Sequence, residues 1–366
     1  MGLRLAWLTL LFVPCGFASD LVFSGSLERV GHESISIRLS DRRVIDARLP
    51  SSSLLQAETV AAQYDMGDRV QMTCKAIQPV WEAETASYQS LELTQLQRLR
   101  KPLPEELSKM PPLPPWRAGV NLLPHWDASV PAPDRRPADE PPLAHAREVN
   151  LEYAANMPNF VADETAKRYT GDGSTEHWRY VDTIETEISF KGRRAVRQRI
   201  RKNGSPWERP FQALPGFKWS GGFGTEIRPL FDPQCPTTIE YAGRAEVRGK
   251  RVLEYRFSSP PDGCFAPFYF DYQRYNPART GHAFLDEAAG NVIQLDEAAS
   301  GFPAEFEFAE RKEDVSWDYV KIGDASHLLP VGANFVVRYS SGSRWRVEVE
   351  YKNHRHFEAS TSVTFQ

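Results

Sequence analysis

The feature that most constrains the fold is a regular alternation of apolar and polar side chains in the C-terminal part of the chain. In residues 344–352, RWRVEVEYK, apolar residues recur at every second position, and residues 177–190, HWRYVDTIETEISF, have nearly the same period. This period is typical of β-strands with one face in the core. Short turns such as Arg248-Gly249-Lys250 favour sequential antiparallel pairing. A single sheet of about ten such strands is expected to curl strongly.

Few helices interrupt this pattern. Asp139, the prolines after it and the stretch LAHAREVNLEYAANMP predict a helix that begins near Pro142 and ends before Pro158. A second, short helix is expected from about Thr225. The sequence therefore predicts a mostly β fold in which residues 142–366 form a strongly curved antiparallel sheet, or half-barrel, with one long helix at its N-terminal end.

Residues 19–100 contain a different order of elements. Three short alternating runs are followed by the helix-like stretch SLLQAETVAAQY and two further runs, which is the order of a small OB-like β-barrel. Residues 101–141 are so rich in proline that we expect neither a helix nor a central strand there. We interpret this stretch as a Pro-rich linker between two modules.

The first residues predict export. Arg4, an apolar run from Leu5 to Val13 and small residues up to Ala18 form the pattern of a signal peptide over residues 1–18. That run is shorter than the roughly 20 residues that span a bilayer, and no later stretch approaches this length, so no transmembrane segment is expected after cleavage. The predicted location is the periplasm or the medium.

Three cysteines remain after cleavage, and the strand register predicts how they pair. Matching the apolar faces of the two strands around Arg248-Gly249-Lys250 sets Cys235 near Pro261 or Gly263, so a Cys235 to Cys264 disulfide is expected. The alternatives, a metal site or a redox centre, would need further ligands at short spacing such as C-x-x-C, and the sequence has none. Cys74 shares a face with Val70 and Met72, which indicates a buried, inert thiol.

Neither catalytic residues nor a cofactor or metal site can be identified. A G-x-S-x-G nucleophile motif is absent, and Ser220-Gly221-Gly222 favours a plain loop and helix cap over an anion cradle. His354 and His356 point the same way on a strand, but a solvated edge explains them better than metal binding. Enzyme activity is left open, with the balance against it. The net charge of −4 predicts no nucleic-acid partner.

Aromatic residues are the remaining clue to a ligand. Both sides of PFYFDYQRY, residues 267–275, can bury apolar surface, so one face could line a cavity for an apolar ligand, while core packing on both faces is the alternative. The predicted ligand-binding residues are those of this stretch and of the strand after His177: Trp178, Tyr180, Phe190, Phe268, Phe270 and Tyr272.

Three stretches carry a family resemblance: YAANMPNFVADETAKRY, EVRGKRV and the ending VEVEYKNHRHFEASTSVTFQ. Together they resemble a large group of uncharacterised secreted bacterial proteins, many of them acidobacterial, over about residues 145–366. One helix on a long antiparallel meander also looks like the lipoprotein-localisation carriers and the related envelope-stress sensors. That second resemblance rests on architecture and implies a half-open barrel that cradles acyl chains, without catalytic residues.

These observations lead to two main hypotheses of function. The first is an exported, non-enzymatic binding protein of the cell envelope that holds a lipid or lipid-modified ligand in the half-open barrel. The alternative is an interaction scaffold with a filled core, whose barrel docks an envelope protein partner. A hydrolase is a distant third hypothesis.

Overall fold

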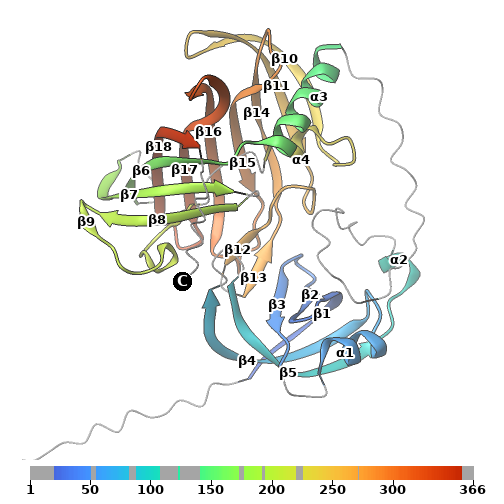
Figure 1. Cartoon of the computed structure of the whole chain (residues 1–366). Helices are drawn as coiled ribbons and strands as arrows, with labels where there is room; N and C mark the ends of the chain where they lie inside the picture. Colours follow the sequence, from blue (N-terminus) through green and yellow to red (C-terminus); the bar gives the residue numbers. More distant parts are fainter. Residues whose placement is uncertain are drawn as a thin grey trace, which may run out of the picture.

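The computed structural model describes residues 20–50, 55–81, 88–107, 123, 141–172, 177–191, 194–219, 226–270 and 272–356. It is mostly β, with two sheets and few helices (Figure 1). The smaller sheet is formed mostly by the N-terminal residues, and the larger one curves around helices α3 and α4. This agrees with the predicted fold class. No helix among the described residues is long and apolar enough to cross a membrane.

The N-terminal module has the predicted order of three strands, a helix and two strands. Strands β1, β2, β3, β4 and β5 pair in the order β3-β2-β1-β4-β5, and a parallel contact between Arg48 and Glu92 brings β3 next to β5 and closes the ring. The bounds are β1 Leu21–Val30, β2 Ser34–Arg38, β3 Val44–Arg48, α1 Ala57–Gln63, β4 Arg69–Trp81 and β5 Tyr88–Arg100. Cys74 is a free, buried thiol of this barrel, and burial raises its pKa to about 12.

The C-terminal module contains an antiparallel sheet of 11 strands in the order β10-β11-β14-β15-β16-β17-β18-β6-β7-β8-β9. Most neighbours along the sheet are also neighbours along the chain, as short turns require. The bounds are β6 Phe160–Gly171, β7 Arg179–Lys191, β8 Arg194–Lys202, β9 Ser205–Pro206, β10 Thr238–Val247, β11 Lys250–Ser259, β14 Ala278–Asp286, β15 Val292–Ser300, β16 Phe308–Ile322, β17 Ala325–Tyr339 and β18 Arg344–His356.

Helices α3 (Pro141–Asn156) and α4 (Ile227–Phe231) lie on the concave side of this sheet (Figure 1). Buried Asn150 fixes α3 to the sheet, because its side chain donates to the carbonyl of Gly290 and accepts from the amide of Val292, both at 2.9 Å. Arg147 of α3 donates to the Phe231 carbonyl at 2.7 Å and so ties α3 to α4. A single turn of 3-10 helix, η1 (Phe211–Ala213), precedes α4.

The stretch PFYFDYQRY forms a hairpin rather than the single strand that alternation suggests. Its strands β12 (Phe268–Phe270) and β13 (Gln273–Tyr275) pair with each other, and β13 pairs with β3 of the barrel. Because Phe268 lies opposite Tyr275, both side chains share a buried face. The smaller sheet is therefore completed by a hairpin from the other module, and the two modules are in contact (Figure 1).

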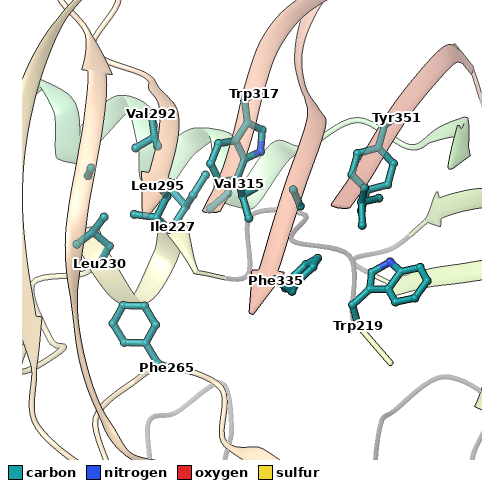
Figure 2. Close-up of a cluster of buried hydrophobic side chains, with 14 of the residues drawn as sticks. Trp219, Ile227, Leu230, Phe265, Val292, Leu295, Val315, Trp317, Phe335 and Tyr351 are labelled. Carbon is teal, nitrogen blue, oxygen red and sulfur yellow. The ribbon is translucent and has the colours of Figure 1, made fainter. Parts of the chain in front are cut away.

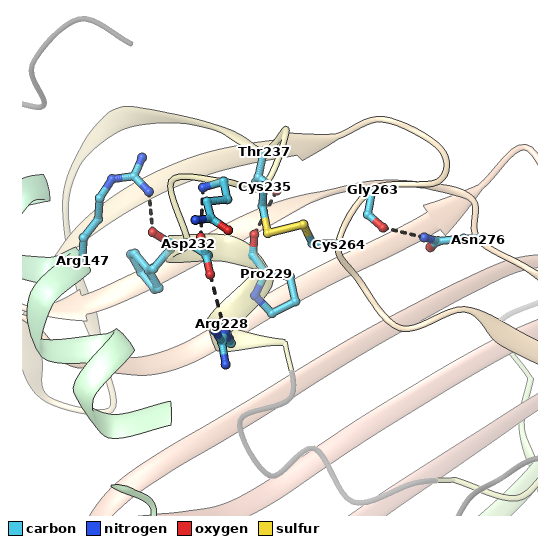
Figure 3. Close-up of a disulfide and its surroundings, with 11 residues drawn as sticks. Arg147, Arg228, Pro229, Asp232, Cys235, Thr237, Gly263, Cys264 and Asn276 are labelled. Carbon is cyan, nitrogen blue, oxygen red and sulfur yellow. Dashed lines mark hydrogen bonds and ion pairs between the residues drawn. A yellow bond between two sulfur atoms is a disulfide. The ribbon is translucent and has the colours of Figure 1, made fainter. Parts of the chain in front are cut away.

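A disulfide joins Cys235 to Cys264 with 5.6 Å between the Cα atoms (Figure 3). Near the turn, the pairing of β10 with β11 is displaced by one residue from the predicted register. An irregularity between Tyr241 and Gly243 restores the predicted register, so that Ile239 lies opposite Phe257. The corrected register extrapolates Cys235 to the loop that contains Cys264. Asn276 holds that loop through a bond from its amide to the Gly263 carbonyl at 2.8 Å.

One detail of the linker differs from expectation. A one-turn helix, α2 (Pro104–Leu107), lies within residues 101–141, where we expected none. Proline at the first position of a helix is compatible with that geometry, because the amide it lacks would have no partner there. The predicted signal peptide, most of the predicted linker and Ser220-Gly221-Gly222 lie outside the described residues, so the domain boundaries remain predictions.

Candidate functional site

The concave side of the large sheet is the place where a half-barrel would hold a ligand. Here α3, α4 and residues 211–219, which we call the covering segment, pack on the inward side chains of the strands. Trp317 and Phe335 have no exposed surface, and Trp219 of the covering segment is also buried. Figure 2 shows side chains from the sheet and from the covering elements in this core: Trp219, Ile227, Leu230, Phe265, Val292, Leu295, Val315, Trp317, Phe335 and Tyr351.

A cluster of aromatic rings fills the end of the core near the barrel. Phe302 lies 5.3 Å from Phe268, 5.5 Å from Phe306 and 5.7 Å from Tyr275, measured between ring centroids. Phe308 adds a ring 5.8 Å from that of Phe306. These distances are typical of direct aromatic packing, so the aromatic content of residues 267–275 is used here for a filled core.

Buried ion pairs interrupt the apolar core. Arg168 and Asp182 form a bidentate pair with both nitrogen–oxygen distances at 2.7 Å, and neither side chain has more than 1% of its surface exposed. Burial alone would raise the pKa of Asp182, but the hydrogen bonds and charge of Arg168 hold it below its usual value. Arg168 also donates to the Pro215 and Phe217 carbonyls at 2.8 and 3.3 Å, which fixes the covering segment to β6.

A second buried pair acts on the same segment. Arg197 of β8 donates to both oxygens of Glu164 at 2.6 and 2.8 Å, and the indole of Trp219 donates to Glu164 at 3.0 Å. Burial would raise the pKa of Glu164, and the neighbouring Arg197 lowers it below its usual value. Glu164 is therefore a charged anchor for the covering segment, and its acceptors are occupied.

The third polar group lies between β14, β15 and β16. Arg279 pairs with Glu297, and Arg311 donates to Glu313 at 2.6 Å. Burial, together with Glu226 and Glu297, raises the pKa of Glu313 to about 8 although Arg311 and Arg279 act in the opposite direction. Desolvation of a fully buried carboxyl outweighs one good ion pair here, so burial favours the protonated form of Glu313. These groups place two arginines and two acidic side chains side by side between the strands.

The predicted ligand residues do not gather at one site. Phe190 stacks on Phe160 at 5.6 Å in the core, and Phe268 is buried between Arg279 and Arg311, whose guanidinium carbons lie 4.3 and 4.8 Å from its ring. Phe270 packs 6.3 Å from Phe306. Tyr272 packs on the barrel, 5.6 Å from Phe23.

Trp178 and Tyr180 lie on the other face of the sheet. The register slips by one residue between the Arg168–Asp182 and Tyr169–Tyr180 pairs. A slip of one residue turns the next side chain to the opposite face, so Tyr180 is exposed beside Tyr169, with ring centroids 5.9 Å apart. Trp178 lies against the guanidinium carbons of Arg344 and Arg346, at 4.7 and 5.2 Å.

Sequence reasoning missed the charged interface between the modules. Arg38 of the barrel bonds Glu28 at 2.8 Å and Asp262 of the disulfide loop at 2.7 Å. Arg274 of β13 lies 3.4 Å from Glu28 and 3.1 Å from Asp46. Burial would raise the pKa of Glu28, but Arg274 and Arg38 lower it. The only sequence signal was the presence of arginines within strands that otherwise alternate.

No group of three or more metal-binding side chains comes together among the described residues. His354 bonds the Pro330 carbonyl at 2.9 Å and packs 5.7 Å from Phe160, and burial lowers its pKa. His356 lies 5.9 Å from His327. His354 is therefore used in packing, which the interpretation as a solvated edge did not predict.

No protein-family model and no curated protein matches this chain. Several solved structures are remotely similar to it, including the following three. A DUF1329 family protein from Desulfovibrio piger is 10% identical, with 60% of this chain and 95% of that chain covered and a TM-score of 0.31. A putative outer membrane lipoprotein-sorting protein domain from Vibrio parahaemolyticus is 9% identical, with 58% of this chain and 92% of that chain covered and a TM-score of 0.26. A LolA superfamily protein from Nitrosomonas europaea is 8% identical, with 60% of this chain and 94% of that chain covered and a TM-score of 0.27. At these TM-scores we draw no conclusion about function from the similarity.

Proposed function

We propose that this chain is an exported, non-enzymatic binding protein of the cell envelope that works as a rigid scaffold with a filled half-barrel. The observation that carries this proposal is the packing of the concave side. Large side chains from the sheet, such as Trp317 and Phe335, and from the covering elements, such as Trp219, are buried against one another. The arginines in this interior each lie against an acidic side chain.

A lipid in the half-barrel would require this interior to open. Sites for small apolar molecules are cavities of about 300–1,000 Å³ with mostly apolar walls. The concave side instead contains the buried pairs of Arg168 with Asp182 and Arg197 with Glu164, both bonded to the covering segment or its neighbours. Placing an acyl chain there would separate these groups from their partners, which costs several kcal/mol per ion. A closed core is therefore the arrangement that the contacts favour.

Rigidity follows from how the modules are joined. Strand β13 of the large module pairs with β3 of the barrel, and Arg38 bonds Asp262 across the same contact. The disulfide at Cys264 holds the loop that contains Asp262. Surfaces of both modules would then be presented to an envelope protein partner in one fixed relation.

Native mass spectrometry of the mature protein purified from a periplasm tests the proposal. The expected result is the mass of the bare chain with one disulfide, and no saturable binding when a fluorescent fatty acid is added. A stoichiometric acyl species that remains bound through purification, or that is displaced by the fluorescent fatty acid, would overturn the filled scaffold in favour of a lipid carrier.

A further inference from the structure

A groove of about 590 Å³ lies on the outward face of the large sheet, opposite the core. It crosses β16, β17 and β18, whose inward side chains, such as Phe335 and Val347, are buried. Because side chains alternate along a strand, the lining residues point away from that core. The groove is lined by Trp178, Glu310, Lys312, Asn334, Val336, Arg338, Arg344 and Arg346.

The register arranges these residues in two rows across the strands. Arg338 of β17 lies opposite both Glu310 of β16 and Arg344 of β18. In the next row, Val336 of β17 lies opposite both Lys312 of β16 and Arg346 of β18. Val336 is half-buried and forms an apolar floor between two cations.

Aromatic rings hold the guanidinium groups at one side of the groove. The guanidinium carbon of Arg346 lies 4.7 Å from the ring of Tyr169 and 5.2 Å from that of Trp178, and that of Arg344 lies 4.7 Å from Trp178. Gly171 is paired with Arg344, and a Cβ at this position would lie 3.3 Å from the His177 carbonyl oxygen and 3.4 Å from the Trp178 ring, so the strand passes close to the indole. Packing on rings fixes arginine side chains before a ligand arrives.

Cations outnumber carboxylates among the side chains that line the groove. Four cations line it with one carboxylate, Glu310, which lies 3.4 Å from Lys312 and 3.5 Å from Arg338. Arg346 is also 2.6 Å from Glu348, but its buried Nε has no hydrogen-bond partner among the described residues. In a chain with a net charge of −4, such an excess of cations is a local feature. Clustered cations in a hollow concentrate anions there.

We propose that this groove binds a phosphate ester, with Arg344 and Arg346 donating to the phosphate oxygens and Val336 and Trp178 contacting the attached organic group. Forked guanidinium donors match the geometry of phosphate oxygens, and the volume lies in the range of small-molecule sites. The phosphate can come from a soluble metabolite or from a lipid headgroup at the membrane surface. This inference does not depend on whether the half-barrel is filled.

The test uses the mature full-length chain and two probes: glycerol 3-phosphate, titrated by calorimetry, and vesicles of phosphatidylglycerol or phosphatidylcholine, followed by co-sedimentation. Binding of glycerol 3-phosphate assigns the site to soluble esters, and binding to phosphatidylglycerol vesicles alone assigns it to headgroups. In either case the double variant Arg344→Gln/Arg346→Gln is expected to weaken binding about tenfold or more, since charged hydrogen bonds are lost. Added salt should weaken it as well.

Arg244→Gln/Arg251→Gln is the matched control, because it removes two charges from exposed arginines on β10 and β11, at the far end of the sheet. It should bind like the wild type. A second variant, Val336→Glu, places a carboxylate on the groove floor and should abolish binding while the arginines stay in place. Equal affinity of the wild type and the double variant, or the absence of saturable binding to both probes at low salt, would overturn the proposal.

Discussion

Replacing Arg168 by methionine should cost about 3–5 kcal/mol of unfolding free energy. The structure gives the reason. Arg168 is fully buried, forms the bidentate pair with Asp182 and donates to the carbonyls of Pro215 and Phe217. Methionine leaves Asp182 with only Lys202, 3.4 Å away, as a charged partner among the described residues, and it leaves both carbonyls without this donor. An uncompensated buried carboxylate is what makes this loss larger than that of a surface pair.

Urea denaturation followed by far-UV circular dichroism measures this loss, because the midpoint should fall while the slope stays the same. The control is Arg201→Met, since Arg201 is exposed and its guanidinium bonds the Gly204 carbonyl; it should stay within about 0.5 kcal/mol of the wild type. The double variant Arg168→Met/Asp182→Leu should recover part of the stability, because no charge is then left alone.

The same variant should also expose the interior. Arg168 holds the carbonyls of the covering segment, so its loss should raise the fluorescence of an apolar dye such as 1-anilinonaphthalene-8-sulfonate in native buffer. A loss below about 1 kcal/mol, with no change in dye binding, would show that the pair is hydrated and that the segment is held by other contacts.

Three further predictions concern the core, the disulfide and the interface. Because the pKa of Glu313 is raised from 4.5 to about 8 in the folded state, the folded state keeps a proton that the unfolded state loses between these values. The free energy of unfolding should therefore fall as the pH rises from about 5 to about 8.5, and urea denaturation at several pH values measures this fall. The variant Glu313→Gln should show a flatter pH dependence. Replacing Cys235 and Cys264 by serine should cost about 3–4 kcal/mol by calorimetry, although a change near zero would mean that loop closure contributes little. Arg274→Gln should lower stability by about 1–3 kcal/mol and speed proteolysis at the interface, and unchanged cleavage would contradict a rigid contact.

The local parts of the fold could be predicted from the sequence. Alternation with a period of two identifies strands such as β18 because one face of each is in the core and the other is in water. The long helix ends at Asn156, before Pro158, as proline requires. The barrel order of three strands, a helix and two strands was also visible. Each of these predictions depends only on residues that are close together in the sequence.

Contacts between distant residues could not be predicted in this way. Gln273 pairs with Ile45, and no periodicity connects residues 228 positions apart. The turn of Tyr180 to the outer face depends on a one-residue slip, which leaves no mark in composition. Arg168 and Asp182 occupy inward positions where alternation predicts apolar residues, since pattern reasoning cannot tell a paired buried charge from a solvated one.

Arginine has different roles on the two faces of the large sheet, and its exposure distinguishes them. On the concave face Arg168 donates to Asp182 and to the covering segment, and Arg197 donates to Glu164 and lies over the ring of Phe211, so these guanidinium groups are already used within the fold. On the outward face Arg344 and Arg346 rest on aromatic rings in a groove with excess positive charge. A guanidinium buried in the core is out of reach of a ligand, whereas a guanidinium that is held on a ring beside solvent is accessible to one. The outward face is therefore where a binding function for this chain should be sought first.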